Sequence, residues 1–198
     1  MNIKYELVAG GYYTLVDGDS KLTMFVESKD EEEGVFSAIV ANDGDLYERE
    51  YAIGLFETNM RLATFDEREE FIALNPYQET WLEAVVNELV PKHWGVDDRP
   101  SIMLDPIEHM PTAFFGAYDA PSRSLVFHSG MLALRSEEEI RTTVLHELCH
   151  WYLHITGEAY RDEDVRFAQE IIRVGVEETI NYHREDARQA YEEAKRNS

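Results

Sequence analysis

The spacing of hydrophobic and polar positions changes partway along the chain. Up to about residue 65, short apolar stretches that partly alternate with polar residues are separated by turn residues such as Asp17-Gly18-Asp19 and Asn42-Asp43-Gly44-Asp45. β-branched and aromatic residues are frequent in these stretches, which include "YYTLVDG", "KLTMFVES", "GVFSAIVAND" and "LYEREYAIGLF". Such alternation between turns is typical of antiparallel strands joined by hairpins. Residues 1–65 are therefore predicted to form a small antiparallel β module.

Apolar residues then recur with helical spacing. In the first such stretch every fourth residue is apolar, namely Tyr77, Trp81, Val85 and Leu89. Residues at this spacing share one face of a helix. Asn75 and Pro76 are of the types preferred at an N-cap and at the first helical position, so a helix is predicted to begin there.

The rest of the chain mixes short strands and helices. Strands are predicted over 101–105, 112–120 and 123–129, the last two as a hairpin. Ser136 and Glu139 form a capping box before an apolar helical face that ends near Gly157. A further helix is indicated from about Asp162, and its pattern could continue past Gly175 into the charged tail. We expect an α+β fold in which residues 66–198 form a second domain.

Composition and charge argue against several classes of function. Hydrophobic residues make up 44% of the 198 residues, enough for a real core, and no apolar run approaches the ~20 residues that span a bilayer. The net charge of −22 opposes binding to nucleic acid and to anionic membranes. The start of the chain lacks the features of a signal peptide, so a cytoplasmic protein with no membrane partner is expected. Cys149 is the single cysteine and is interpreted as a core residue. No pattern indicates an oligomeric state.

The stretch "TTVLHELCHWYLHITG", residues 142–157, carries the candidate chemistry. His146 and His150 are four residues apart on the predicted helix, so both imidazoles can reach one Zn²⁺ ion. Glu147 would then lie beside the metal, where it can take a proton from a metal-bound water and later return it to the leaving amine. This pattern predicts a zinc-dependent hydrolase with Glu147 as general base.

A catalytic zinc of this kind needs a third protein ligand. No histidine stands in "EAYRDEDVRFAQE" after Gly157. The candidates there are Asp162, Glu163, Asp164 and Glu170, and further along the chain Glu177, Glu178 and His183. The spacing from His150 to Glu170 is similar to that of thermolysin-like gluzincins.

The segment "VLHELCHWYLHITGEAYRDEDVRFAQEIIRVG" resembles the SprT family of zinc metalloproteases, to which the spartan-type enzymes are related. The shared features are HELCH, the following aromatic and Leu-His, and a Gly, a Tyr and a charged cluster that ends in Phe. The resemblance extends over about 75–176. It implies a minimal zincin fold and hydrolysis of peptide bonds in a protein or peptide substrate. Spartan-type enzymes cut proteins crosslinked to DNA.

The sequence also departs from the family pattern. Bacterial members carry the third zinc-binding histidine two residues after the tyrosine, and Asp162 stands at the matching position. Because aspartate can ligate zinc through oxygen, the predicted metal ligands are His146, His150 and Asp162. The alternative for Asp162 is to cap the next helix. The cysteine-rich zinc module of some members is absent, and the acidic charge does not support nucleic acid as a partner.

Two further hypotheses concern how a substrate binds, and a third concerns the function as a whole. An extended substrate is expected to pair with the sheet edge beside the active helix, formed by "RSLVFHS" or "TAFFGAYDA". The β module could recruit or shield the substrate. The alternative function is an acidic binding protein, such as a DNA mimic, in which the HELCH helix is a structural or vestigial metal site.

Overall fold

The computed structural model describes residues 6–105 and 115–197. Within them the chain forms two compact units with helices and β-strands, which confirms the predicted α+β class. The first unit holds the described residues of Met1–Gln78, Leu104–Phe115 and Phe127–Arg135, and the second those of Glu79–Met103, Gly116–Val126 and Ser136–Ser198. The division into domains 1–65 and 66–198 stays a prediction. A compact unit is defined by its contacts, whereas a domain is a segment that can fold by itself. No described helix is both long and apolar enough to cross a membrane.

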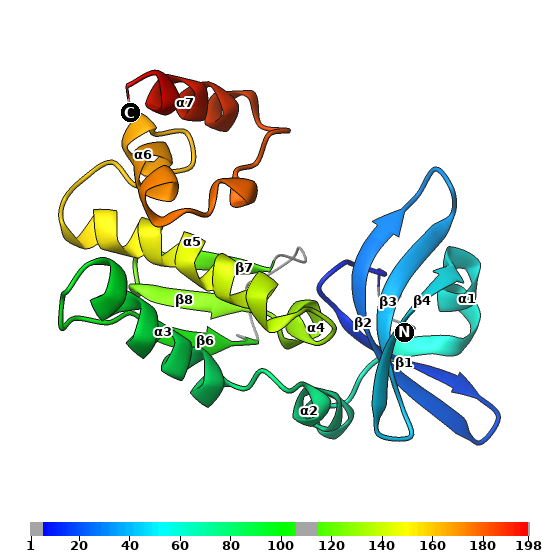
Figure 1. Ribbon diagram of the computed structural model, residues 1–198. Coiled ribbons are helices and arrows are strands. Elements are labelled where there is room, and N and C mark those ends of the chain that lie inside the picture. The colour runs from blue at the N-terminus through cyan, green and yellow to red at the C-terminus, as the bar shows by residue number, and fades with distance from the viewer. Residues whose placement is uncertain (1–5, 106–114, 198) are drawn as a thin grey trace. The chain divides into compact units, whose positions relative to one another are not determined.

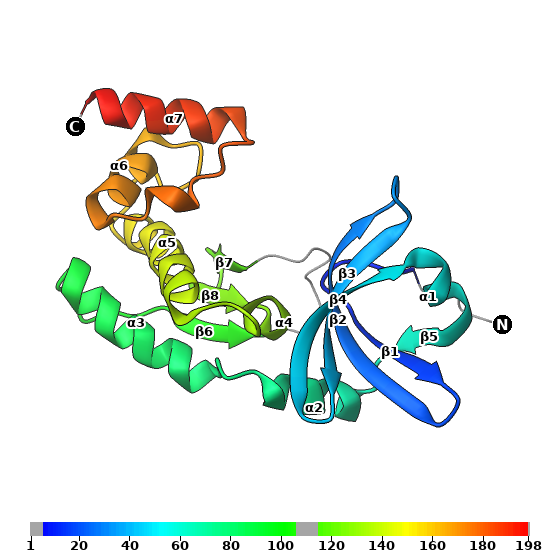
Figure 2. The same ribbon diagram turned by 45° about the vertical axis from the view of Figure 1, so that its right-hand side comes forward.

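A five-stranded antiparallel sheet forms most of the first unit, in the order β4-β3-β2-β1-β5 (Figures 1 and 2). Its strands are β1 (Tyr12–Asp17), β2 (Ser20–Asp30), β3 (Val35–Asn42), β4 (Asp45–Ala52) and β5 (Met60–Leu62). A two-residue turn at Asp43-Gly44 joins β3 to β4, and both residues have positive φ, 52° and 91°. Paired positive φ values are those of the hairpin turn that Asp-Gly favours. The predicted antiparallel strands are thus present here.

Side chains of this sheet alternate between its two faces, and each face contributes to a core cluster. Met24 and Val26 point into one core cluster, which the partly buried residues of α1 (Ile53–Asn59) also line. Phe25, between them in sequence, joins the opposite cluster with Phe71 and Met131. Phe71 lies on α2 (Phe65–Leu74) and Met131 on α4 (Ser129–Leu132). The sheet is therefore covered by α1 on one face and by α2 and α4 on the other.

Two sequence predictions in this unit are wrong. The stretch "LYEREYAIGLF" is not one strand, because β4 ends at Ala52 and α1 begins at Ile53. Asn75 does not begin a helix: it ends α2, and its side chain accepts a hydrogen bond from the Tyr77 amide and donates one to the Ser129 carbonyl. These two bonds turn the chain, so the next helix, α3 (Glu79–His93), begins four residues later.

The second unit contains a three-stranded sheet with α5 alongside it (Figures 1 and 2). Its order is β6-β8-β7, so β7 is an edge strand and β8 the central one. The predicted strand 112–120 begins outside the described residues. The elements are α3, β6 (Ser101–Leu104), β7 (Gly116–Asp119), β8 (Ser124–Phe127), α5 (Glu137–Ile155), α6 (Val165–Val174), the 3₁₀ turn η1 (Glu177–Thr179) and α7 (Glu185–Arg196). Leu104 and Phe127, the last residues of β6 and β8, belong to the first unit.

The ends of these helices follow from local sequence. Ser136 and Glu139 form the predicted capping box at the start of α5. α6 ends at Gly175, which adopts the left-handed conformation with φ 81° that favours glycine. The pattern that could have continued past Gly175 is therefore interrupted there, and the charged tail forms the separate helix α7.

Glu67 of α2 joins three elements of the first unit. Its carboxylate accepts two hydrogen bonds from Arg61, at 2.6 and 2.7 Å, and one from Thr14 of β1 at 2.9 Å. It also closes the capping box of α2 through the Thr64 amide. The Arg61 guanidinium and these other donors hold the pKa of Glu67 far below its usual range, against the effect of burial.

We expect Glu67→Gln to destabilise the first unit by about 1.5–3 kcal/mol at pH 7, the range for hydrogen bonds to charged groups. Because the pKa of Glu67 is lower in the folded state, its contribution is complete above the unfolded pKa of about 4.3 and is lost as the pH falls toward the folded value. Urea unfolding at pH 7 and pH 3 measures the effect.

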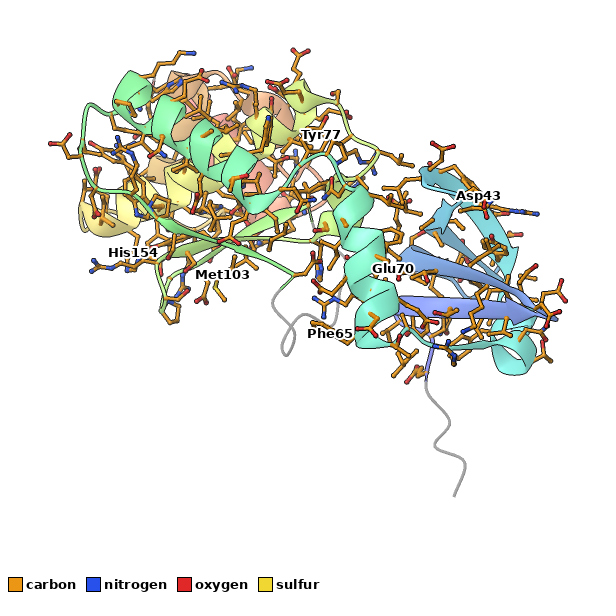
Figure 3. All side chains as sticks on the ribbon, turned by 90° about the horizontal axis from the view of Figure 1, so that it is seen from below. Asp43, Phe65, Glu70, Tyr77, Met103 and His154 are labelled. Carbon is orange, nitrogen blue, oxygen red and sulfur yellow. The ribbon has the colours of Figure 1, made fainter. Side chains whose placement is uncertain are left out.

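The matched control is Glu70→Gln, which removes the same charge from an exposed side chain of α2 (Figure 3). The difference in unfolding free energy between the parent protein and the Glu67 variant should shrink at pH 3. A difference that is equal at both pH values, or that the Glu70 variant reproduces, would contradict this role.

Candidate metal centre

One turn of α5 brings together the three residues of the predicted motif. His146, Glu147 and His150 each offer a ligand atom, and these atoms lie within 4.8 Å of one another. Leu148 and Cys149, on the same turn, are fully buried and anchor the helix in the core. Elsewhere in the described part of the chain, no other cluster of three potential metal-ligating side chains is found.

The outer nitrogen of each histidine has its own hydrogen-bond acceptor. His146 Nδ1 lies 2.7 Å from Thr179 Oγ1, whose hydroxyl already donates to the Val176 carbonyl. His150 Nδ1 lies 2.5 Å from the Tyr160 carbonyl oxygen, which can only accept. Both Nδ1 atoms must therefore carry the proton, and in the neutral rings both Nε2 lone pairs are free.

The two free nitrogens face each other at an Nε2–Nε2 distance of 3.2 Å. Two nitrogens bound to one tetrahedral zinc ion at about 2.0–2.1 Å lie roughly 3.3 Å apart. Two lone pairs at this distance repel unless a proton or a cation lies between them. The donor set and its spacing thus fit a Zn²⁺ ion.

Asp162 completes a three-sided arrangement. Its Oδ1 atom lies 3.7 Å from His146 Nε2 and 3.5 Å from His150 Nε2. Asp162 does not cap the following helix, because the N-cap of α6 is Asp164. A hydrogen bond with His150 lowers the pKa of Asp162, so its carboxylate is ionised at neutral pH. Two nitrogens and one carboxylate oxygen are ligands that zinc accepts.

The two imidazoles cannot both be charged at this distance. Burial, reinforced by the neighbouring His150, lowers the pKa of His146 to about 3. Burial also disfavours charge on His150, but Asp162, Glu147 and the Tyr160 carbonyl raise its pKa above the usual value. His146 is therefore neutral at pH 7, as a metal ligand must be, and the pair holds at most one proton.

Glu147 is more deeply buried than the other acidic residue of the site. The Glu147 side chain is 8% exposed, whereas the Asp162 side chain is 36% exposed. Burial raises the pKa of Glu147 to about 7, although His150 and a hydrogen bond from the backbone of Tyr118 oppose the shift. Its Oε1 atom lies 4.0 Å from His146 Nε2. A carboxyl group with this pKa can both take up and return a proton near neutral pH.

The other candidate ligands are held elsewhere. Glu170 is 1% exposed, and its oxygens accept hydrogen bonds from Trp94, Arg166 and Arg173. Asp164 accepts a bond from the Arg161 amide, and Glu163 pairs with Arg161 and Arg184. The more distant candidates Glu178 and His183 are exposed, and Glu177 belongs to η1.

Aromatic side chains line the site on two sides. The Phe167 ring stacks on His150 with 4.0 Å between centroids and an interplanar angle of 11°. His154, on the next turn of α5, is labelled in Figure 3. Its Nδ1 atom shares a 2.7 Å hydrogen bond with the Tyr118 hydroxyl, and its ring packs against Tyr160. Tyr118 belongs to the edge strand β7, so this cluster lies where α5 and β7 meet.

Several of these partners give no signal in the sequence. The motif predicts His146, Glu147 and His150 from local spacing, but Thr179 and the Tyr160 carbonyl are set by the path of the chain after α5. A threonine 33 residues from its histidine, or a backbone carbonyl, has no recognisable pattern. Of the two predicted substrate edges, only "TAFFGAYDA" contributes an edge strand, β7. "RSLVFHS" forms the central strand β8.

Comparison with known proteins adds independent information. The model of the SprT-like family matches residues 82–183, about half of the chain. A "Protein SprT-like" of Enterococcus faecalis is 32% identical over 60 residues, 30% of this chain and 39% of that protein. The "Protein SprT-like" of Geobacillus kaustophilus is 32% identical over 78 residues, 35% of this chain and 51% of that protein. The chain thus spans about half or less of the length of these relatives. No solved structure matches it.

We expect Thr179→Val to change the tautomer of His146. Without the hydroxyl acceptor, Nδ1 of His146 loses its partner, and the proton shifts in part to Nε2. Imidazole ¹⁵N chemical shifts of the metal-free protein report the tautomer of each ring. Thr143→Val, on the same helix as His146 but bonded to the Glu139 carbonyl, is the matched control. A His146 tautomer that does not respond to Thr179→Val would contradict the assignment.

The third ligand is tested by zinc content. We expect Asp162→Ala to lose bound zinc, with a drop in affinity at least as large as the roughly 10–100-fold typical of losing a ligand's hydrogen-bond partner. Glu170→Gln should keep the zinc and lower the melting temperature, because Glu170 holds Trp94, Arg166 and Arg173 together. Elemental analysis and competitive chelation measure both variants. Zinc loss in the Glu170 variant alone would favour a gluzincin-like site.

Proposed function

The chain belongs to the SprT-like family, and on that premise we propose that it is a zinc-dependent endopeptidase with a minimal zincin domain. The observation that carries the proposal is the pair of Nε2 atoms 3.2 Å apart, with Asp162 Oδ1 within 3.7 Å of both and the buried Glu147 beside them. The geometry supports His146, His150 and Asp162 as metal ligands and Glu147 as the catalytic base.

Each side chain has a separate task in this proposal. Zn²⁺ bound by the two histidines and Asp162 would act as a Lewis acid and lower the pKa of water toward about 7. Thr179 and the Tyr160 carbonyl hold both Nε2 atoms toward one point by fixing the Nδ1 protons. Glu147 takes the proton of the attacking water at a carboxylate oxygen and delivers it to the nitrogen of the leaving amine.

The substrate is proposed to bind along β7. This strand is at the edge of the sheet and packs beside α5, and no described strand pairs with its outer side, where an extended peptide would add as a further strand. Tyr118 places its backbone against Glu147 and its hydroxyl against His154, which would bring a peptide on this edge to the catalytic base. Backbone hydrogen bonds depend little on the side chains of the substrate, so we expect broad specificity for unfolded protein segments.

We expect Glu147→Gln to lower the turnover number by about 10²–10⁴-fold, the usual contribution of a general base, without loss of bound zinc. Glutamine keeps the size of the side chain but cannot accept the proton. Cleavage of casein, an unfolded protein, by the zinc-loaded chain measures the rate. Glu138→Gln removes the same group from the exposed first turn of α5 and is the control.

Activity within a few-fold of the parent protein in the Glu147 variant would overturn the assignment. The same variant separates the enzyme from an acidic binding protein. A biological activity that persists after Glu147→Gln would belong to partner binding and not to peptide hydrolysis. If the parent protein binds no zinc after reconstitution, the endopeptidase proposal fails as a whole.

A further inference from the structure

The proposed third ligand, Asp162, is a carboxylate whose side chain is 36% exposed. A carboxylate is shorter than a histidine side chain, has two equivalent oxygens and rotates freely when exposed. Only one of its oxygens, Oδ1, faces the two Nε2 atoms. Something must hold the carboxylate in that orientation if it is to act as a ligand.

Arg184 occupies the other side of this carboxylate. Its Nη1 atom donates to Asp162 Oδ2 at 3.2 Å, so the guanidinium and the histidines take one oxygen each. Arg184 contacts none of the predicted ligands other than Asp162 in the described interactions. Its hydrogen bonding therefore reaches the metal site through this one residue.

The guanidinium is itself held in place by neighbouring groups. Asp186 accepts two bonds from Arg184, at 2.8 and 3.2 Å, and Glu163 accepts one at 3.3 Å. The Arg184 backbone is fixed at the N-cap of α7, where its amide donates to the Asn181 carbonyl. α7 in turn packs on α6 through the buried residues Ala187, Ala190, Tyr191 and Ala194. Although the Arg184 side chain is 43% exposed, a guanidinium held at several points orients a carboxylate better than one without these bonds.

We propose that Arg184 is a positioning residue of the metal centre, which orients Asp162 so that Oδ1 faces the two histidines. The inference rests on the proposed function, because it takes Asp162 as the third ligand. Thr179, which orients His146, belongs to the same connection between α6 and α7. This connection, residues 175–184, thus supplies one orienting group to each of two ligands.

Arg184 could have the opposite role and weaken metal binding, and an experiment can distinguish the two roles. An arginine beside a carboxylate can compete with a metal ion for the same oxygens. If Arg184 orients Asp162, its removal weakens zinc binding. If it competes, its removal strengthens zinc binding. The two roles therefore predict zinc affinity changes of opposite sign.

The experiment measures the zinc dissociation constant of the full chain by competition with a chromophoric chelator. We expect Arg184→Ala to weaken binding by roughly tenfold or more, as for other groups that orient a ligand, and Arg184→Lys to recover only part of the loss. Arg188→Ala removes the same charge from α7, where Arg188 pairs with Glu185, and should leave affinity unchanged. Melting temperatures in the presence of EDTA show whether each variant still folds.

Coupling to Asp162 separates positioning from a general charge effect. In an Asp162→Ala background, Arg184→Ala should have no further effect on zinc affinity, because its action passes through that carboxylate. An unchanged or tightened affinity in the folded Arg184→Ala variant would overturn the inference, as would an equal loss in the Arg188 variant. If the parent protein binds no zinc, or Asp162→Ala binds it as well as the parent, the proposed metal centre itself fails.

Discussion

Two imidazole nitrogens that face each other at close range impose the main constraint on the second unit. The Nε2 atoms of His146 and His150 lie 3.2 Å apart, and each Nδ1 atom is hydrogen-bonded on the far side of its ring. The pair holds at most one proton, and the surrounding packing keeps the two rings in this arrangement. Phe167 stacked on His150 and the buried turn of α5 provide that support. The site is thus preorganised to receive a cation.

The parts that the sequence could predict are those with short-range causes. The helix spacing of His146 and His150, the capping box at Ser136 and the hairpin turn at Asp43-Gly44 depend on neighbours along the chain, and the structure contains each of them. Asn75 illustrates the limit: as a residue type it fits an N-cap, but the Ser129 carbonyl, far away in sequence, makes it a turn residue. The orienting partners Thr179 and Arg184 likewise depend on the tertiary path, which local patterns do not record.

The chain is acidic as a whole, and the candidate metal centre also contains two acidic side chains. Asp162 and Glu147 bring two carboxyl groups close to the Nε2 atoms of the histidine pair. Each has a different environment: Glu147 is buried beside the backbone of Tyr118, and Asp162 is partly exposed and paired with Arg184. The difference in surroundings separates the two groups into a proton carrier and a permanent anion.

The first unit has a consequence for how the protein is made. Phe25 and Ile39 of its sheet pack against Met131 and Ala133, residues that leave the ribosome long after the sheet strands. Until then, one apolar face of a nascent sheet is without part of its cover. A ribosome that pauses between these segments would expose an aggregation-prone surface, and the rate of translation through residues 104–135 therefore bears on the yield of folded protein.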